Sequence, residues 1–372
     1  MNRSMPIVFF ILCIWFVVSF VTNILGPLTP IIIENFSLSY KMASFLPFSF
    51  FLAYGLASIP AGALIERLGM KKALLIAFGL NFVGAFAFAL FPVYLVALAS
   101  LFTIGVGMAM TQVVINPLMR TAGGEENFAF FSVMGQLVFG FASFVSPAVF
   151  TYLMVSIPNK AAQNPLVGFL DVLTPDRLPW VALYWVFGFA FFVMIAVVMR
   201  TRLPKAELAE DEKTGSFDVY VALFKERYVQ AFFLGLICYV GLEQGATIWM
   251  SEFLSVYHGV DPKTLGAASV GKFWGLMSLG CLVGLGLLKL VDSKVLLRFA
   301  CGLAALCLVF AVFGSESQAL FCFPMIGFFI SIMFSIIFSL ALNSAKEHHG
   351  AFSGILCTGI FGGALMPFIM GV

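Results

Sequence analysis

The sequence predicts an all-α protein that crosses a membrane many times, and three observations support this prediction. Of its 372 residues, 62% are hydrophobic and only 10% are charged, whereas a soluble domain carries about 25% charged residues. Apolar runs of about 20 residues, the length that crosses about 30 Å of hydrocarbon, recur along the whole chain. These runs are rich in Phe and Leu and show no strand alternation. In a bilayer they are therefore expected to form helices, which pair their own backbone polar groups.

Short polar breaks divide the chain into eleven predicted transmembrane helices. In the first half these cover residues 6–32, 42–65, 72–91, 93–118, 128–154 and 179–199. In the second half they cover residues 228–256, 264–288, 294–313, 318–343 and 350–371. The polar stretch 201–227 between the two sets is predicted to link an N-terminal six-helix bundle (1–200) to a C-terminal bundle (228–372). Because the C-terminal bundle holds five helices, we expect a twelfth helix to be missing.

The distribution of positive charge predicts the topology, since cytoplasmic loops collect Lys and Arg. With the N-terminus inside, fifteen of the 20 basic residues fall on the inner side. Four fall on the outer side, namely Lys41, Lys160, Arg177 and Lys263, and Lys272 falls within a span. The sequence therefore predicts a cytoplasmic N-terminus, in what we expect to be a bacterial inner membrane.

A short charged turn lies between the second and third predicted spans. It reads Gly62-Ala-Leu-Ile-Glu66-Arg67-Leu-Gly69-Met-Lys71-Lys72. Glycines permit a tight turn and close helix approach, and charges at helix ends can bridge to neighbouring helices. The turn resembles the signature loop of the major facilitator superfamily, with Glu66 where Asp is usual. A degenerate copy at residues 286–294 of the second half is consistent with two related halves.

This resemblance implies the major facilitator fold, in which two pseudo-symmetric helical bundles transport a solute. For Gly62, Glu66, Arg67, Gly69 and Lys71 we expect a role in holding helices together and in gating closure on the inner side. Superfamily membership alone does not identify the solute.

Further stretches resemble the fucose permease type of sugar symporter, which carries hexoses and related sugars with protons or sodium. They include Thr22 to Pro27, Gln112 to Pro117, Gly135-Gln136, Val240 to Glu243 and Phe273-Trp274-Gly275. The resemblance covers nearly the whole chain in order. It implies import of a sugar or similar small polar solute by alternating access.

Several polar positions of that family are replaced here. Gly26 and Gln112 stand where family members place carboxylates that load protons and engage sugar. Phe139, Cys281 and Ile330 replace an Asn, an Arg and an Asn of the family pattern. The resemblance therefore implies a less polar pocket than is usual and leaves the coupling open: it can use sodium, use Glu243 alone, or be absent.

Glu243 is the only acid deep inside a predicted span, near the middle of residues 228–256. A charge at that depth costs up to about 3 kcal/mol on insertion scales, so it requires an explanation. We predict that Glu243 is the coupling site for a proton or sodium, or an acceptor for sugar hydroxyls. The alternative is a structural hydrogen bond between helices, with Gln244 beside it.

Amides and one aromatic ring complete the predicted substrate site. Asn23, Gln112 and Gln136 offer donors and acceptors together, which can replace water around sugar hydroxyls. Trp274 is predicted to stack on a sugar ring, by resemblance. Asn116 precedes Pro117 and is more simply explained as satisfying backbone groups that the proline frees. For Lys272 we favour extension to the outer interface over a water-bridged link to Glu243.

The remaining residues argue against other classes of protein. The net charge is only +2, which gives no footprint for nucleic acid, and there is no phosphate-binding loop. The seven cysteines lack metal-ligand spacing and are interpreted as packing residues, so we expect no metal and no cofactor. The three histidines lie in loops without acidic partners at motif spacing, so we expect no enzyme. The expected molecule is a monomeric transporter in the lipid bilayer; alternatives are an exporter of amphipathic compounds or an uncoupled facilitator.

Overall fold

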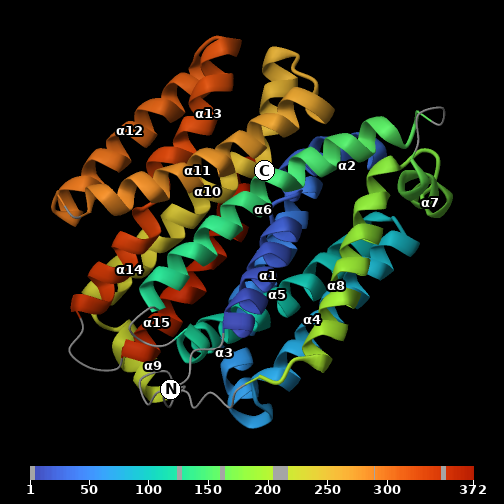
Figure 1. The fold of residues 1–372 in the computed structure, drawn as a ribbon. Coiled ribbons are helices and arrows are strands. Elements are labelled where there is room, and N and C mark those ends of the chain that lie inside the picture. Colours follow the sequence, from blue (N-terminus) through green and yellow to red (C-terminus); the bar gives the residue numbers. More distant parts are fainter. Residues whose placement is uncertain (1–4, 124–127, 160–163, 204–216, 289, 345–348) are drawn as a thin grey trace.

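The computed structural model describes residues 5–123, 128–159, 164–203, 217–288, 290–344 and 349–372, and every element within these ranges is helical (Figure 1). The first half contains α1 (Met5–Thr22), α2 (Leu25–Phe36), α3 (Tyr40–Leu68), α4 (Met70–Leu90), α5 (Tyr94–Gly123), α6 (Phe128–Ser156), α7 (Pro165–Leu173), η3 (Pro179–Val181) and α8 (Ala182–Arg200). The second half contains α9 (Phe217–Phe224), α10 (Arg227–His258), η5 (Pro262–Gly266), α11 (Ala267–Leu287), α12 (Ser293–Phe313), α13 (Glu316–Ile330), α14 (Met333–Ser344), α15 (His349–Thr358), η6 (Gly359–Phe361) and α16 (Gly362–Gly371). The all-α prediction is confirmed.

Each of the eleven predicted spans coincides with a helix or with consecutive helical segments. Ten helical segments of the described chain are long and apolar enough to cross a membrane. The predicted span 42–65 is not among these ten, and it coincides with α3, which is 29 residues long. Two elements were not predicted: α7 lies in the loop expected between the fifth and sixth spans, and α9 lies in the expected linker. Residues 204–216 of that linker lie outside the described part of the chain.

The first span is broken between α1 and α2, and proline explains the break. Residues Asn23 and Ile24 form a turn rather than helix. Pro27 has no amide hydrogen, and its ring clashes with the carbonyl of the residue four positions earlier, which is Asn23. The helix resumes with the hydrogen bond from the Leu28 amide to the Ile24 carbonyl at 3.1 Å. A second break, at residues 331–332 between α13 and α14, contains no proline.

The buried apolar side chains of the described chain form two large clusters, one in each half. The first runs from Val8 to Val198 and gains only four residues of the second half, which are Ile248, Trp249, Ala267 and Ala364. The second runs from Val229 to Leu356. Phe139 and Ile360 pack against both clusters. The chain is thus organised around two cores that meet along a seam, while the domain bounds 1–200, 201–227 and 228–372 stay a prediction.

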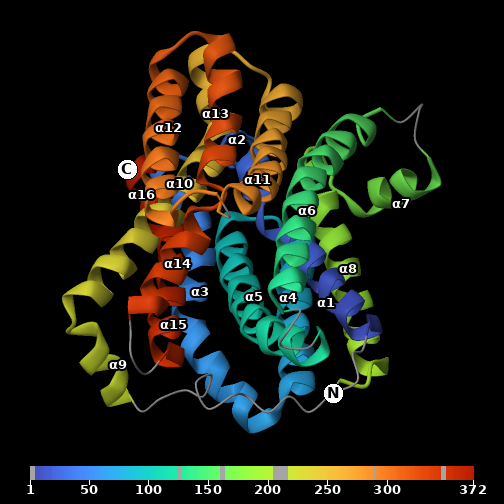
Figure 2. The ribbon, with the colours of Figure 1, turned by 60° about the vertical axis from the view of Figure 1, so that its left-hand side comes forward.

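The seam is formed chiefly by α6 against α11, α3 against α16 and α2 against α10 (Figures 1 and 2). We call the end of the bundle that carries the turns near Arg67, Arg200 and Arg227 the basic end, and the other end the distal end. Two close approaches at the seam lie toward the distal end. A Cβ added at Gly26 would overlap the Thr247 carbonyl oxygen, and one added at Gly371 would lie 2.9 Å from the Tyr40 carbonyl oxygen. The distal end of the seam is therefore closed in this structure.

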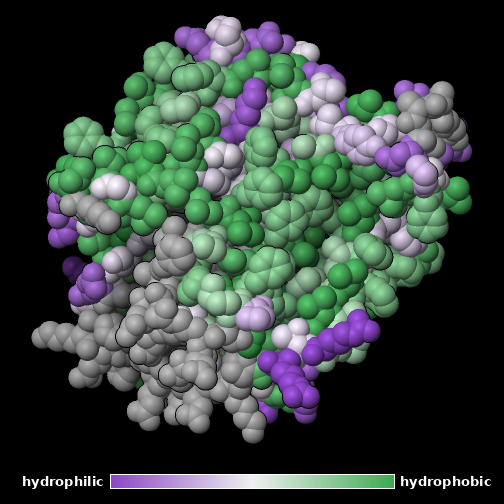
Figure 3. Space-filling view, in the orientation of Figure 1, coloured by the Kyte–Doolittle hydropathy of each residue, from purple (hydrophilic) through white to green (hydrophobic). Residues whose placement is uncertain are grey.

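The outer surface of the helices is apolar, as a bilayer requires. Exposed side chains on these faces include Phe9, Phe189, Phe299 and Phe321, each more than 60% exposed. In Figure 3 hydrophobic residues cover much of the flank of the molecule, and hydrophilic residues gather toward its two ends. An apolar surface of this extent is typical of helices that contact lipid.

The turn between α3 and α4 gives a prediction about stability. Gly69 has φ +80° and ψ 159°, a backbone conformation open essentially to glycine alone. We expect Gly69→Ala to lower the apparent melting temperature of the purified protein, with a loss of about 1–3 kcal/mol of unfolding free energy. Gly79→Ala is the matched control, because Gly79 lies within α4 and an added Cβ meets no atom within 4 Å. Equal melting temperatures for the two variants would contradict this account of the turn.

Candidate functional site

A polar cluster lies at the break between α1 and α2. The Asn23 side-chain amide donates a hydrogen bond to Ser143 Oγ on α6 at 2.7 Å. Ser143 Oγ lies 2.6 Å from Ser19 Oγ, and both hydroxyls donate to the carbonyl of Phe139, at 2.9 and 2.5 Å. Asn23 is only 5% exposed, and its Oδ1 has no hydrogen-bond partner among the described residues. A buried acceptor is thus left open inside the first half.

A second polar cluster surrounds Glu243 on α10. Tyr239 Oη donates to Glu243 Oε2 at 2.7 Å, and the Gln244 side-chain amide donates to Oε1 at 2.9 Å. Thr247 Oγ1 donates to the backbone carbonyl of Glu243 at 2.8 Å. Both carboxylate oxygens are therefore held by uncharged donors, and no cation of the described chain pairs with the acid. A carboxylate without a fixed counter-charge can accept a proton or a small cation without breaking an ion pair.

Helix α11 borders this cluster, and α13 and α14 meet beside it. The Tyr239 ring lies 5.8 Å from the ring of Phe334 on α14. The Cys281 thiol on α11 donates to the carbonyl of Ser331, at the break between α13 and α14, at 3.4 Å. Discontinuous helices are the usual place where a transporter exposes backbone groups at the midplane. The structure thus has a polar group beside a helix break in each half.

Phe139 connects the two halves. Its ring lies edge-on to Trp15 of α1, with centroids 5.9 Å apart, and edge-on to Trp274 of α11, with centroids 6.0 Å apart. Trp274 is 1% exposed, and its indole N–H has no hydrogen-bond partner among the described residues. Trp274, which has the unpaired donor, contacts the Phe139 ring. Asn23, which has the unpaired acceptor, contacts Ser143, and Ser143 donates to the Phe139 carbonyl. Sequence reasoning noted Phe139 only as a lost amide, and no pattern in the chain indicated that it bridges the seam.

The predicted glutamines, Gln112 and Gln136, belong to neither polar cluster. Gln112 on α5 is half-buried and Gln136 on α6 is exposed, and neither forms a hydrogen bond with a described residue. At 100° per residue, Gln136 lies on the same side of α6 as Gly140 and Ser143. Gly140 packs against Ser278 and Trp274 of α11. Gln136 thus continues the seam-facing side of α6 toward the basic end, and the Asn116 side chain lies outside the described part.

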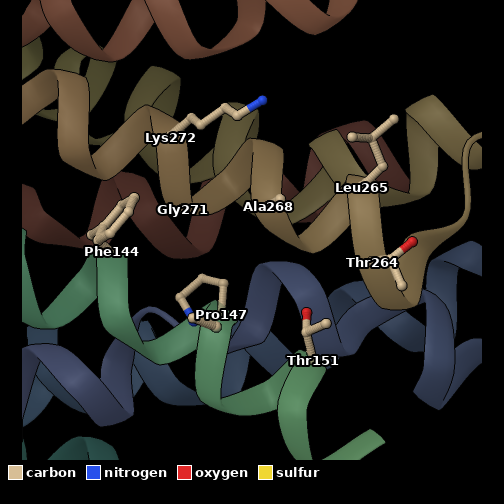
Figure 4. A pocket seen from close by; sticks show the side chains of 9 residues that line it. Phe144, Pro147, Thr151, Thr264, Leu265, Ala268, Gly271 and Lys272 are labelled. Atoms are coloured by element: carbon tan, nitrogen blue, oxygen red, sulfur yellow. The ribbon is translucent and has the colours of Figure 1, made fainter. Parts of the chain in front are cut away.

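Lys272 lies away from Glu243. It is nine residues from Cys281 on α11, which places the two side chains on opposite sides of the helix. It lines a surface groove with Pro147 and Phe144 of α6 (Figure 4). The water-bridged link to Glu243 that the sequence left open is therefore not formed.

The signature turn acts at the basic end. Lys71 Nζ donates to the carbonyls of Met199 at 2.8 Å and Thr201 at 2.9 Å, at the C-terminus of α8. These are carbonyls that a helix leaves without intrahelical partners, and a cation there also complements the helix dipole. Gly62 is half-buried and Arg67 is exposed, and the Glu66 side chain lies outside the described part. Lys71 thus joins α4 to α8, while the gating role of the turn stays a prediction.

The comparisons with known proteins agree with this architecture. The chain is 29% identical over 367 residues to the glucose/galactose transporter of Brucella abortus biovar 1 (strain 9-941), a match covering 96% of this chain and 85% of that protein. It is 25% identical over 397 residues to the L-fucose-proton symporter of Escherichia coli (strain K12), covering 100% and 87%.

A crystal structure of a variant of the Escherichia coli fucose:proton symporter FucP superposes with a TM-score of 0.70 at 21% identity. The superposition covers 100% of this chain and 92% of that one. The family model described as Major Facilitator Superfamily matches residues 11–367. The chain is a multi-pass membrane protein that belongs to the major facilitator superfamily.

Proposed function

We propose that the protein transports a sugar across the bacterial inner membrane by alternating access, as a monomer, with the basic end in the cytoplasm. Its relatives named above are transporters of glucose and galactose or of L-fucose. The observation that carries the proposal is a pair of buried polar atoms without partners, Asn23 Oδ1 and Trp274 Nε1–H. Asn23 contacts Ser143 of α6, and Trp274 contacts Phe139 of the same helix. A sugar hydroxyl donates and accepts at once, so it can satisfy an acceptor in one half and a donor in the other.

Closure at the distal end supports the alternating part of this proposal. Asn23 and Trp274 are both buried, so a solute reaches them only when the seam opens. Gly26 and Gly371 let the halves meet closely at the distal end, and separation there would open the site to that side. Rocking of one bundle against the other around a midplane site is the motion that such a seam permits.

Glu243 is proposed as the coupling residue, with a proton or sodium as the coupling ion and import as the direction. Its two donors, Tyr239 and Gln244, keep the carboxylate in place in the absence of a cation. On protonation the carboxyl group gains an O–H donor and loses its charge, so its hydrogen bonds with Tyr239 and Gln244 weaken or rearrange. A change of charge at this position would therefore alter the packing around α10.

The first prediction tests coupling. In proteoliposomes with an imposed proton or sodium gradient, we expect Glu243→Gln to abolish uphill accumulation of hexose while preserving downhill entry, because the amide cannot exchange a cation. Tyr239→Phe is the matched control: it removes one hydrogen bond and leaves the acid, so accumulation should persist. Accumulation by the Glu243→Gln protein at the wild-type level would disprove the coupling assignment.

The second prediction concerns the glutamine on the seam side of α6. Gln136→Ala should weaken hexose binding about 2- to 10-fold, the size of one lost hydrogen bond, without lowering expression. Gln318→Ala is the comparison, since Gln318 takes part in the capping box at the N-terminus of α13. That variant should lower stability and leave the hexose dissociation constant unchanged. Equal affinities in wild type and Gln136→Ala would remove Gln136 from the binding site.

The third prediction tests closure. Gly26→Val should hold the distal end apart, because the added side chain would occupy the position of the Thr247 carbonyl. We expect a cysteine introduced at Ser251, which is fully buried, to react faster with a water-soluble thiol reagent in this background. Gly188→Val serves as control, because a Cβ at Gly188 meets no atom within 4 Å. Unchanged labelling in the Gly26→Val protein would count against the proposed gate.

A further inference from the structure

A groove separates α6 from α11 on the flank of the molecule, near the distal end of the seam (Figure 4). It has a volume of about 550 Å³. Phe144 and Pro147 of α6 line it on one side, and Leu265 and Ala268 of the second half line it on the other. The hydrogen bond from Thr151 Oγ1 to the Lys263 carbonyl, 2.9 Å long, ties the two halves together where the groove ends.

The groove faces the bilayer and not the interior of the protein. Phe144 is 47% exposed and Leu265 is 41% exposed, and Ala268 and Lys272 are also exposed. Because these residues lie in membrane-spanning helices, their exposed surfaces contact lipid. An apolar channel of this kind accepts an acyl chain more readily than a hydrated solute.

One charged group lies on this groove. Lys272 forms no ion pair or hydrogen bond with any residue in the described ranges. In Figure 4 its side chain extends along α11 on the side of Leu265, which is toward the distal end. A cation at this position and without a protein partner is free to pair with an anion from outside the protein.

The depth of Lys272 lets its side chain extend toward the headgroup level of the distal leaflet. Residues 262–287 span about 39 Å at 1.5 Å per residue, about 9 Å more than the hydrocarbon core. If the excess is shared equally, the Lys272 backbone, about 15 Å from Pro262, lies about 10 Å below the hydrocarbon boundary. The extended side chain brings the ammonium group toward the level of the glycerol esters and phosphate.

We propose that this groove binds one anionic phospholipid of the distal leaflet, with an acyl chain on the apolar floor between α6 and α11 and the phosphate group paired with Lys272. The two halves supply opposite walls, so the lipid contacts both of them at the seam. This site is separate from the polar clusters of Asn23 and Glu243, and its occupation does not depend on the transported solute.

The proposal is tested by native mass spectrometry of the delipidated protein titrated with dioleoyl phosphatidylglycerol or dioleoyl phosphatidylcholine. We expect the first phosphatidylglycerol to bind at least about fivefold more tightly than phosphatidylcholine, the contribution of one lysine to an anionic headgroup. Lys272→Glu should remove this preference, and Lys272→Arg should keep it. Lys41→Glu, a change of the same charge on α3, should also keep it.

A second variant tests the apolar wall independently. Ala268→Leu fills the groove without changing charge and should weaken the binding of both lipids, even if Lys272→Glu does not yield folded protein. The proposal is overturned by equal affinities for the two lipids in the wild type, by a wild-type preference in Lys272→Glu, or by unaltered binding in Ala268→Leu. Displacement of phosphatidylglycerol by hexose would also overturn it, because the groove would then belong to the path of the solute.

Discussion

The structure depends on one constraint: a polar group at membrane depth has no water to bind, so protein or ligand must satisfy it. Most of the chain meets this constraint with uninterrupted helices. At the break before Pro27, the hydroxyls of Ser19 and Ser143 donate to a neighbouring backbone carbonyl, and Asn23 donates to Ser143. Glu243 meets the same requirement with Tyr239 and Gln244. Six buried side-chain polar atoms of the described chain have no hydrogen-bond partner, and the Asn23 acceptor and the Trp274 donor are two of them. These two belong to groups beside Phe139 or Ser143 on α6, which is where we propose that a solute binds.

Close packing of small residues governs the seam between the halves. By the family resemblance Gly26 replaces an acid, and in the structure it allows α2 to pack directly on the backbone of α10. Residue 26 therefore allows close packing of the two helices and carries no charge. Glu243 in the second half is then the acid that remains deep in the bundle, held by donors without a counter-charge. The lower polarity of the pocket stays a prediction. Phe139, which by resemblance replaces an amide, packs between Trp15 and Trp274.

Length and hydropathy were enough to predict the fold, since a span of about 20 apolar residues has few alternatives in a bilayer. The eleven spans were found within a few residues of the helices. The helix breaks were harder to predict, because the one near Pro27 has a local signal and the one at residues 331–332 has none. Lys272 lies on the side of α11 opposite Cys281, and this depends on the rotation of the helix about its axis. Apolar residues surround α11 on all sides in the sequence pattern, so the pattern does not predict that rotation. The contact that Phe139 makes across the seam could not be predicted, because it is formed with two tryptophans distant in the sequence.

The central claim, that hexose crosses the membrane by occupying a site between two alternating halves, is tested most directly by counterflow. Proteoliposomes loaded with unlabelled glucose or galactose are diluted into a trace of labelled sugar without any ion gradient. The account predicts a transient accumulation of label that requires the protein and is competed by external hexose. An absence of label accumulation with glucose, galactose and fucose, from protein shown to be folded, would contradict it.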